Sequence, residues 1–354
     1  MNKLKVGIIG FGMSGRVFHA PLLESMKEYE INKIYTKNPE AIKLAEKEYP
    51  NARVVQDKNE IIKDEEIELV ILAVPNKVHF ILAKDAMENG KHVVIEKPFV
   101  VNSEEGGRLI EISHREKRIL SVYHNRRYDS DFRTIKKVIE KGMVGEVVEY
   151  EAYYNRFRNF LKGNWREEQE EGSGILFDLG SHLIDQALTL FGYPEKVFGD
   201  IRTQRKCAKT TDYFQVTLYY GENLNNLKVT LKAGMLVRES TPRYFLTGEN
   251  GNFVKYGLDV QENDLKNGRK LEGNMEWGKE PKDIWGILNS EVNGMSFRGK
   301  IESEVGDYRD YYRNIHNAIV LEEKLEVTAE QALDVIKIIE LAELSSREGR
   351  IINT

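Results

Sequence analysis

The feature that most constrains this chain is a glycine-rich segment near its start, Val6-Gly-Ile-Ile-Gly-Phe-Gly-Met-Ser-Gly15. An apolar run leads directly into the spacing Gly-x-Gly-x-x-Gly, and a helical pattern follows. In such turns the first glycine permits a tight turn, the second lets the backbone approach a pyrophosphate, and the third allows close helix–strand packing. Free N–H groups at the start of the helix favour phosphate binding. The segment therefore predicts a Rossmann domain that binds a dinucleotide.

The rest of the first third alternates short apolar runs with helical patterns. The run Leu69–Val74 shows no polar–apolar alternation, so we expect this strand to be buried on both faces. Such burial indicates an α/β fold with a parallel sheet between layers of helices. The expected strands are Lys5–Ile9, Ile31–Tyr35, Arg53–Val55, Leu69–Val74, His92–Ile95 and Ile119–Tyr123, and the expected helices are Ser14–Met26, Pro39–Glu48, Val78–Glu88 and Ser103–Glu116.

After about residue 124 the pattern changes to longer strands that alternate imperfectly, which is typical of a sheet with one covered face. A hairpin-like turn separates two of these strands, near Gly221. We predict a second, α+β domain with a large, mostly antiparallel sheet, and a surface excursion at residues 257–300, which are rich in Gly, Asn and charge. The expected strands are Glu146–Tyr154, Tyr213–Tyr220, Leu227–Ala233 and Arg243–Thr247, and the expected helices are Asp131–Lys141, Asp307–Leu321 and Ala329–Glu348.

Length and composition narrow the class of protein further. A chain of 354 residues is too long for one hydrophobic core, so two domains are expected. The net charge of −5 provides no general attraction for nucleic acid. Cys207 is the only cysteine, which excludes an intrachain disulfide and argues against a cysteine-based metal site. No apolar run suits a signal peptide or a membrane span, so we expect a cytoplasmic protein without a metal, nucleic-acid or membrane partner.

The residues after the second expected strand bear on which dinucleotide binds. NAD-binding domains place an acidic residue about 20 positions after the glycines to bind the ribose 2′-hydroxyl. The segment Ile34–Asn38 contains no carboxylate, and Thr36 and Lys37 offer a hydroxyl and a cation instead. This favours NADP, although Lys37 is also compatible with a solvated turn, which leaves NAD possible.

Several motifs occur together along the chain. They are Gly10-Phe-Gly-Met-Ser-Gly-Arg-Val-Phe-His-Ala-Pro-Leu, Pro75-Asn76 with His79, Gly90-Lys-His-Val-Val-Ile-Glu96-Lys97-Pro98, His124-Asn-Arg-Arg-Tyr-Asp129 and Asp178-Leu-Gly-Ser-His182-Leu-Ile-Asp185. Together they resemble the Gfo/Idh/MocA oxidoreductase family, and the resemblance runs almost from end to end of the chain. Within the family, the Asn125-Arg-Arg127 motif and Tyr154-Asn-Arg-Phe-Arg158 are most similar to the NADP-linked inositol dehydrogenase-like branch.

This resemblance implies a Rossmann domain at residues 1–124, joined by C-terminal helices at 305–354, and a substrate-binding and oligomerisation domain at 125–304 with an open-faced sheet. It also implies a homodimer or homotetramer built on that face. The apolar and aromatic side chains on strands near 213–233 point the same way, because they are costly to leave in water. The implied substrates are sugars, polyols and inositols, generally handled without a metal.

Lys97 follows the fifth expected strand, at the carboxyl edge where open parallel sheets bind ligands. Its ammonium group could stabilise negative charge on the reacting oxygen while hydride leaves the carbon. Asp178 and His182 are four residues apart on one expected helix face. By resemblance, His182 is the general acid/base and Asp178 assists with substrate binding and proton management. A helix-capping Asp beside a structural His is the alternative, and Asp185 is expected to be structural.

Other residues have weaker assignments. Asn76 and Asn125 follow strands and are expected to contact the cofactor or substrate. Tyr154 and Trp165 could stack on a sugar ring or fill the core. Arginines 126, 127, 156, 158 and 166 suit either an acidic substrate or ion pairs at a domain junction, and His19 is a cofactor-proximal candidate. The candidate cofactor-binding residues are Gly10, Phe11, Gly12, Met13, Ser14, Thr36, Lys37, Pro75, Asn76, His79, Glu96, Lys97 and Asn125, and the candidate substrate-binding residues are Lys97, Asn125, Arg126, Tyr154, Trp165, Asp178 and His182.

These residues predict an NAD(P)-dependent dehydrogenase that transfers hydride between nicotinamide and a secondary alcohol or ketone. Two rival functions use the same fold. One is NAD-dependent glycoside hydrolysis, in which transient oxidation precedes elimination. The other is a non-catalytic sugar or dinucleotide sensor, which would be expected to lose Lys97 or His182, and both are present.

Overall fold

The computed structural model describes residues 3–161, 163, 167–271, 273–292 and 294–354. The chain forms two compact units. Unit 1 comprises Met1–Asn125, Gln261–Trp277 and Asp307–Leu333, and unit 2 comprises Arg126–Val260, Gly278–Gly306 and Asp334–Thr354. The domain boundaries expected near residues 124 and 305 stay predictions. Among the described helices, none is long and apolar enough to cross a membrane.

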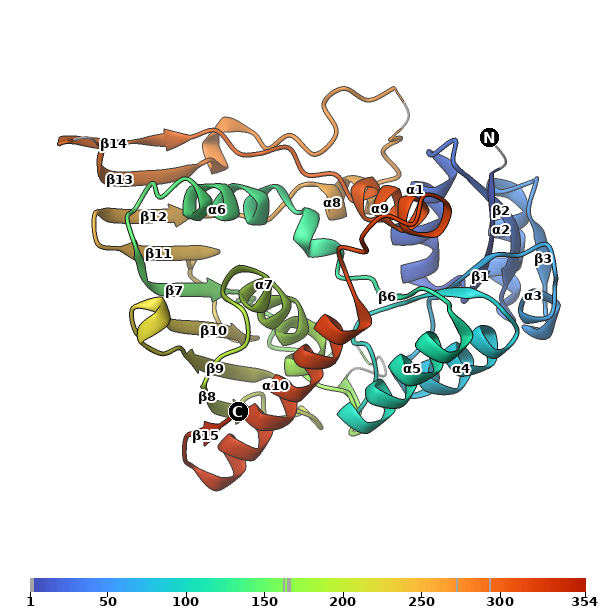
Figure 1. The fold of residues 1–354 in the computed structure, drawn as a ribbon, viewed down its shortest axis with the longest axis horizontal. Coiled ribbons are helices and arrows are strands. Elements are labelled where there is room, and N and C mark those ends of the chain that lie inside the picture. Colours follow the sequence, from blue (N-terminus) through green and yellow to red (C-terminus); the bar gives the residue numbers. More distant parts are fainter. Residues whose placement is uncertain (1–2, 162, 164–166, 272, 293) are drawn as a thin grey trace. The chain divides into compact units, whose positions relative to one another are not determined.

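Unit 1 is built on a six-stranded sheet with the order β3-β2-β1-β4-β5-β6, in which every pairing is parallel. All four residues of β4 are buried, because helices lie on both faces of the sheet (Figure 1). The predicted parallel Rossmann sheet is therefore confirmed. Its strands are β1 Leu4–Ile9, β2 Tyr29–Tyr35, β3 Arg53–Val55, β4 Leu69–Leu72, β5 His92–Ile95 and β6 Leu120–Val122.

The helices of unit 1 differ from the expected ones mainly after the glycine turn. The expected helix Ser14–Met26 is divided into a π-turn, η1 (Gly15–His19), and a short helix, α1 (Ala20–Glu24). Pro21 lies in the first turn of α1, and because proline has no N–H it cannot continue the preceding helical hydrogen bonds. The other helices are α2 Pro39–Glu48, α3 Asn59–Ile62, η2 Asn76–Val78, α4 His79–Glu88, α5 Ser103–Glu116, α8 Gln261–Lys266 and α9 Arg309–Val320.

Unit 2 contains a nine-stranded sheet with the order β14-β13-β12-β11-β7-β10-β9-β8-β15. Among the pairings of its described strands, only β10–β7 is parallel, so the predicted mostly antiparallel sheet is confirmed. The strands are β7 Val147–Tyr153, β8 Lys196–Arg202, β9 Tyr213–Tyr219, β10 Lys228–Gly234, β11 Tyr244–Gly248, β12 Gly251–Lys255, β13 Gly286–Val292, β14 Met295–Ile301 and β15 Ile352–Asn353.

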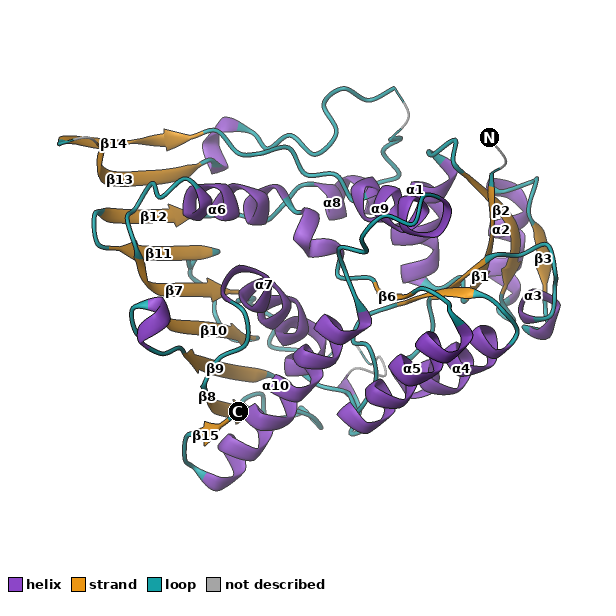
Figure 2. Ribbon diagram, viewed as in Figure 1, coloured by secondary structure: helices purple, strands orange, loops and turns teal. Residues whose placement is uncertain are grey.

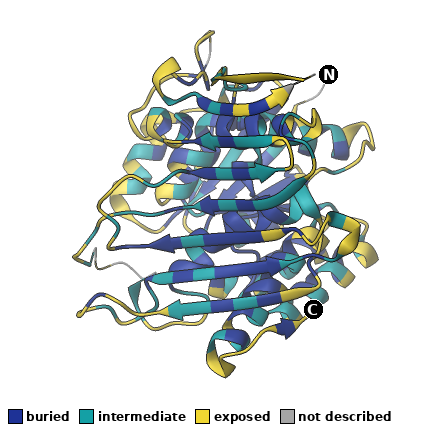
Figure 3. Ribbon diagram, turned by 90° about the vertical axis from the view of Figure 1, so that its left-hand side faces the viewer, coloured by how far each residue is buried: buried dark blue, intermediate teal, exposed yellow. Residues whose placement is uncertain are grey.

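Helices cover one face of this sheet, as the secondary-structure colouring shows (Figure 2). The side chains of Tyr150, Phe214, Tyr244 and Phe253 are fully buried in this unit. On the other face, which is turned toward the viewer in Figure 3, no described helix lies over the strands. The described helical segments of unit 2 are η3 Asn125–Tyr128 from Arg126 onward, α6 Ser130–Glu140, η5 Leu176–Gly180, α7 Ser181–Phe191, η6 Glu222–Leu224, η7 Lys282–Ile284 and, from Asp334 onward, α10 Ala329–Glu348.

The expectation of a surface excursion at residues 257–300 is wrong for its second half. Strands β13 and β14 pair with each other in a hairpin, and β13 extends the sheet beyond β12. The pattern did not reveal β14 because Met295 to Arg298 are all exposed and the strand lies at the sheet edge. An edge strand without a buried face has no apolar alternation to detect.

Candidate functional site

The glycine turn after β1 has the geometry that its sequence predicts. Gly10 has a φ of 104°, and a Cβ there would lie 2.3 Å from the backbone oxygen of Ala73. A Cβ on Gly15 would lie 2.1 Å from the oxygen of Gly10. A Cβ on Gly12 would have no neighbour within 4 Å, so the backbone at Gly12 faces open space. Steric need therefore accounts for Gly10 and Gly15, whereas Gly12 leaves room for a ligand.

An open pocket adjoins this turn. It brings together Thr36, after β2, with the turn residues Phe11, Gly12 and Met13. Lys37 is exposed and is not among the residues that line the pocket. Sequence reasoning missed Arg16 and Glu40, which line it as well. Arg16 directly follows the last glycine of the motif, and that position could have revealed it. The remaining lining residues are Asn38, Ala41 and Leu44.

Glu96, at the end of β5, is the centre of a buried hydrogen-bond network. Its carboxylate accepts hydrogen bonds from the hydroxyl of Ser14 and from the backbone N–H of Lys97, the latter at 3.0 Å. It also contacts Nε2 of His19 at 2.9 Å, and Nδ1 of His19 lies 2.5 Å from the hydroxyl of Tyr312. Burial opposes ionisation of Glu96, but the hydrogen bonds and charges of its neighbours prevail and lower its pKa to about 2. Glu96 therefore stays ionised. Its carboxylate links Ser14 of the glycine turn to the backbone of Lys97, the candidate catalytic lysine.

The remaining candidates in unit 1 follow other strands of the same parallel sheet. Asn76 is buried in η2 after β4, and Asn125 is buried after β6. Lys97 is half-buried after β5, and Pro75 is exposed. Because parallel strands present their carboxyl ends along one edge, these residues share the edge with the glycine turn.

His79 is completely buried at the start of α4. Its Nε2 lies 2.9 Å from the oxygen of Val74, and its Nδ1 lies 3.1 Å from the oxygens of Pro98 and Phe99. Burial lowers the pKa of His79, and its hydrogen bonds to these backbone oxygens oppose that shift. The ring links the segments that follow β4 and β5, and direct contact with a cofactor stays a prediction.

In unit 2, the candidates Asp178 and His182 lie at the start of the helix that packs on the sheet. Asp178 is half-buried in the π-turn η5, and His182 is buried as the second residue of α7. The backbone N–H of Asp178 donates to Gly174, whose φ is 89° and where a Cβ would lie 2.5 Å from Thr211 Oγ1. Glycine at position 174 thus lets the backbone pass close to the side chain of Thr211 just before η5 begins.

Two interactions hold α7 against η3. Arg127 donates from Nη2 and Nε to the carboxylate of Asp185, at 2.6 and 2.9 Å. Gln186 is fully buried and donates to the backbone oxygen of Arg126 at 2.9 Å. The oxygen of Gln186 accepts from the hydroxyl of Tyr244 and from Arg243. The helix that carries His182 is therefore fixed at two consecutive positions.

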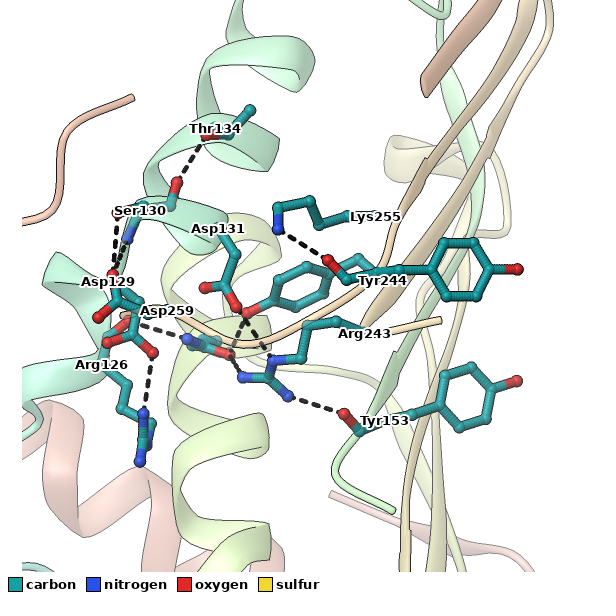
Figure 4. Close-up of polar contacts among 12 residues, drawn as sticks. Arg126, Asp129, Ser130, Asp131, Thr134, Tyr153, Arg243, Tyr244, Lys255 and Asp259 are labelled. Atoms are coloured by element: carbon teal, nitrogen blue, oxygen red, sulfur yellow. Dashed lines mark hydrogen bonds and ion pairs between the residues drawn. The ribbon is translucent and has the colours of Figure 1, made fainter. Parts of the chain in front are cut away.

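Arg126 itself pairs with Asp129 at 3.1 Å, as Figure 4 shows. Tyr154 is 2% exposed, and its ring contacts the guanidinium groups of Arg126, Arg156 and Arg243 at 4.6–5.2 Å. A role for Arg126 or Tyr154 in substrate binding stays a prediction. Trp165 and Arg166 lie outside the described residues.

A second pocket lies within unit 2. It has Asp178 in its wall together with three arginines, Arg156, Arg158 and Arg205. The other lining residues are Glu167, Gly174, Ile175, Thr210, Thr211, Asp212 and Met235. Within the described parts of the chain, no group of three or more His, Cys, Asp or Glu side chains is placed to hold a metal ion.

Comparison with known proteins matches both parts of the chain to one family. Residues 4–124 match the "Oxidoreductase family, NAD-binding Rossmann fold" model, and residues 136–354 match the "Oxidoreductase family, C-terminal alpha/beta domain" model. The chain belongs to the Gfo/Idh/MocA oxidoreductase family. It is an NAD(P)-binding oxidoreductase, and the expected resemblance is confirmed.

Individual relatives cover nearly the whole chain. It is 42% identical to the scyllo-inositol 2-dehydrogenase (NADP(+)) IolW of Bacillus subtilis, over 99% of this chain and 96% of that protein. The structure of the oxidoreductase yvaA from Bacillus subtilis superposes with a TM-score of 0.95 and 42% identity, covering 100% and 99% of the two chains. An oxidoreductase from Bacteroides fragilis superposes with a TM-score of 0.92 and 40% identity, covering 100% of both chains.

Proposed function

We propose that this protein interconverts a secondary alcohol and a ketone on an inositol or a related polyol or sugar, with NADP(H) as its redox partner. The observation that carries the proposal is the near full-length similarity to an NADP-dependent scyllo-inositol 2-dehydrogenase in a chain that has Lys97, Asp178 and His182. These side chains suit proton transfer to and from an alcohol oxygen.

The residues around the glycine turn fit a dinucleotide. Gly12 faces open space at the start of η1, and Gly10 and Gly15 have the tight geometry that a pyrophosphate-binding turn requires. When bound, the nicotinamide supplies or accepts the hydride. The protein would hold the dinucleotide with the turn residues Gly10, Phe11, Gly12, Met13 and Ser14, and with Pro75, Asn76, His79, Glu96, Lys97 and Asn125 along the carboxyl edge of the sheet.

The preference for NADP rests on the pocket beside Thr36. No carboxylate occupies the position at the end of β2, whereas the hydroxyl of Thr36 and the guanidinium of Arg16 line the pocket. A 2′-phosphate would find a hydrogen-bond donor and a cation there. Lys37 would then contribute long-range attraction only, since it does not line this pocket. Glu40 lines the pocket as well, and NAD binding would use its carboxylate.

The catalytic roles divide between a cation and an acid/base. Lys97 would donate to the substrate oxygen and stabilise its developing negative charge during oxidation. His182 would accept the hydroxyl proton, since an imidazole titrates close to neutral pH. Asp178 would orient the substrate and favour the protonated imidazole through its negative charge. In reduction the same groups act in the reverse order.

A substrate panel tests the proposal. Inositols, aldoses and their keto forms would be incubated with NADP(H) and NAD(H), and the reduced-nicotinamide absorbance followed. We expect turnover with at least one polyol, faster with NADP. Release of free sugar from a glycoside without a net absorbance change would instead indicate glycoside hydrolysis, and binding without either change would indicate a sensor.

A further inference from the structure

The sequence between β7 and η5 places two arginines on one side of an extended segment. Arg156 and Arg158 are two residues apart, and the backbone N–H groups of both donate to oxygens of Gly234 and Met235, at 2.9 and 2.7 Å. Phe157, between them, forms a single antiparallel bridge with Leu236. In extended backbone, residues i and i+2 share a face, and both arginines line the same pocket.

The third arginine of the pocket is already neutralised. Arg205 donates to Asp212 at 2.8 Å, contacts Glu167 at 3.4 Å and donates to the backbone oxygen of Phe160 at 2.7 Å. Asp212 also accepts the backbone N–H groups of residues 204 and 205. These contacts account for Arg205 and Asp212 as part of the pocket wall.

Arg156 and Arg158 have no such partner. Neither guanidinium forms a salt bridge with any carboxylate of the described residues. The guanidinium carbon of Arg156 lies 5.0 Å from the centroid of the Tyr154 ring, which is a cation–π contact. A ring contact holds a guanidinium in place without cancelling its charge. Of the carboxylates that line the pocket, Asp212 and Glu167 contact Arg205, and within the described part of the chain none forms a salt bridge with Arg156 or Arg158.

Repulsion among the positive charges of Arg156, Arg158 and Arg205 is electrostatically unfavourable. Burial lowers the pKa of Arg158, and the positive charges of Arg156 and Arg205 lower it further, against the opposing effect of Glu167 and Asp178. Guanidinium groups that line a pocket and form no ion pair with its described carboxylates are available to bind an anionic group of a ligand. Guanidinium groups are well suited to this role because their planar donors match carboxylate and phosphate oxygens.

We propose that Arg156 and Arg158 bind a carboxylate or phosphate group carried by the sugar or polyol substrate. The inference rests on the proposed function, because Asp178 of the proposed catalytic set lines the same pocket and so places the anionic group close to the reacting part of the substrate. The hydroxyl groups of Thr210 and Thr211 line the pocket as well and can donate to the same oxyanion. The preferred substrate is then an acidic polyol or sugar.

Calorimetric titration of the NADP(H)-saturated protein with matched compounds tests this inference. The probes are D-glucose against D-glucuronate and D-glucose 6-phosphate, and myo-inositol against myo-inositol 1-phosphate. We expect at least one acid to bind about 10- to 100-fold more tightly than its neutral parent, as charge-assisted hydrogen bonds predict. The Arg156→Gln/Arg158→Gln double variant should lose this advantage while its affinity for the neutral parents changes less than about threefold.

Arg298→Gln serves as the matched control, because Arg298 is exposed on edge strand β14. This variant should keep the full advantage of the acid. The inference is overturned if no acid binds more tightly than its parent, if the double variant keeps the advantage, or if it weakens acid and parent equally.

Turnover measurements distinguish a failure of the anion-binding inference from a failure of the proposed function. If neutral polyols are oxidised and the acids bind no better, only the anion-binding inference fails. If an acid binds through Arg156 and Arg158 but no compound of either class exchanges hydride with NADP(H) or NAD(H), only the proposed function fails.

Discussion

Arg127 and Asp185 form a two-point ion pair that joins η3 to α7, with N–O distances of 2.6 and 2.9 Å and side chains only 9% and 3% exposed. Asp185 follows His182 by three residues, so this pair lies one helical turn from the candidate acid/base. The sequence motif therefore combines the candidate acid/base, His182, with Asp185, which anchors the helix that carries it.

We expect Asp185→Ala to lower the free energy of unfolding by about 3–5 kcal/mol, because it breaks a buried ion pair by removing the carboxylate to which Nη2 and Nε of Arg127 both donate. The double variant Arg127→Met/Asp185→Leu should recover most of that loss, since it removes both charges together. Urea unfolding of the three proteins measures both effects. A loss below about 1 kcal/mol in Asp185→Ala would show that the pair contributes little more than a surface ion pair.

The Glu96 network predicts a specific pH dependence of stability. The folded-state pKa of about 2 lies below the ordinary 4.5, so the ionised carboxylate stabilises the fold above about pH 4.5, and this contribution is lost as the pH falls toward 2. Its size is on the order of 3 kcal/mol. The difference in unfolding free energy between the parent protein and Glu96→Gln should therefore shrink between pH 6 and pH 3. A difference that stays constant over this range would mean that the charge of Glu96 does not stabilise the fold.

Cofactor preference should follow the pocket beside Thr36. Arg16→Ala should weaken NADP binding about 10- to 100-fold with little effect on NAD, because it removes a charge-assisted contact to the 2′-phosphate. Thr36→Asp should shift preference toward NAD by at least about tenfold, since a carboxylate repels the phosphate. Lys43→Ala, exposed on α2, is the control. Fluorescence titration with both dinucleotides measures these changes, and equal affinity of the parent protein for the two would remove the basis of the NADP assignment.

The open face of the unit 2 sheet predicts self-association. Tyr153, Tyr213 and Tyr219 are half-buried and alternate with buried residues along β7 and β9, which assigns them to the sheet face over which no described helix lies (Figure 3). We expect a homodimer or homotetramer in light scattering at micromolar concentration, because a second copy would remove this surface from water. Tyr219→Lys should shift the equilibrium toward monomer, and a parent protein that is already monomeric would contradict the expectation.

The parts of the fold that could be predicted from the sequence are those with a strong local signal. The unbroken apolar run at Leu69–Leu72 and the glycine turn at Gly10 are determined by burial and by backbone geometry, and both leave a clear pattern. Strand β14 leaves none, because its first four residues are exposed and it depends on pairing with β13. Such long-range pairing cannot be inferred from local periodicity.

The residues of the candidate site likewise differ in whether the local sequence reveals them. Lys97 and the glycines are recognisable because their motif surrounds them in sequence. Arg16 directly follows the last glycine of the motif, but that it lines a pocket together with Thr36, 20 residues later, is visible only in the folded chain. Arginines that pair with acids and arginines that face a pocket look alike in sequence, and the structure separates Arg127 from Arg156 only through their partners.

The most direct test of the central claim is the turnover of His182→Ala, Lys97→Ala and their double variant on the substrate that the panel identifies. Each single variant should lose about 10²–10⁴ in kcat, as expected for a positioned acid/base or oxyanion-stabilising group. The double variant should lose much less than the product of the two, because both groups act on one oxygen and its proton. Dinucleotide affinity should barely change in His182→Ala, and exposed His114→Ala should behave as the parent protein. Near-full activity in His182→Ala would contradict the proposed mechanism.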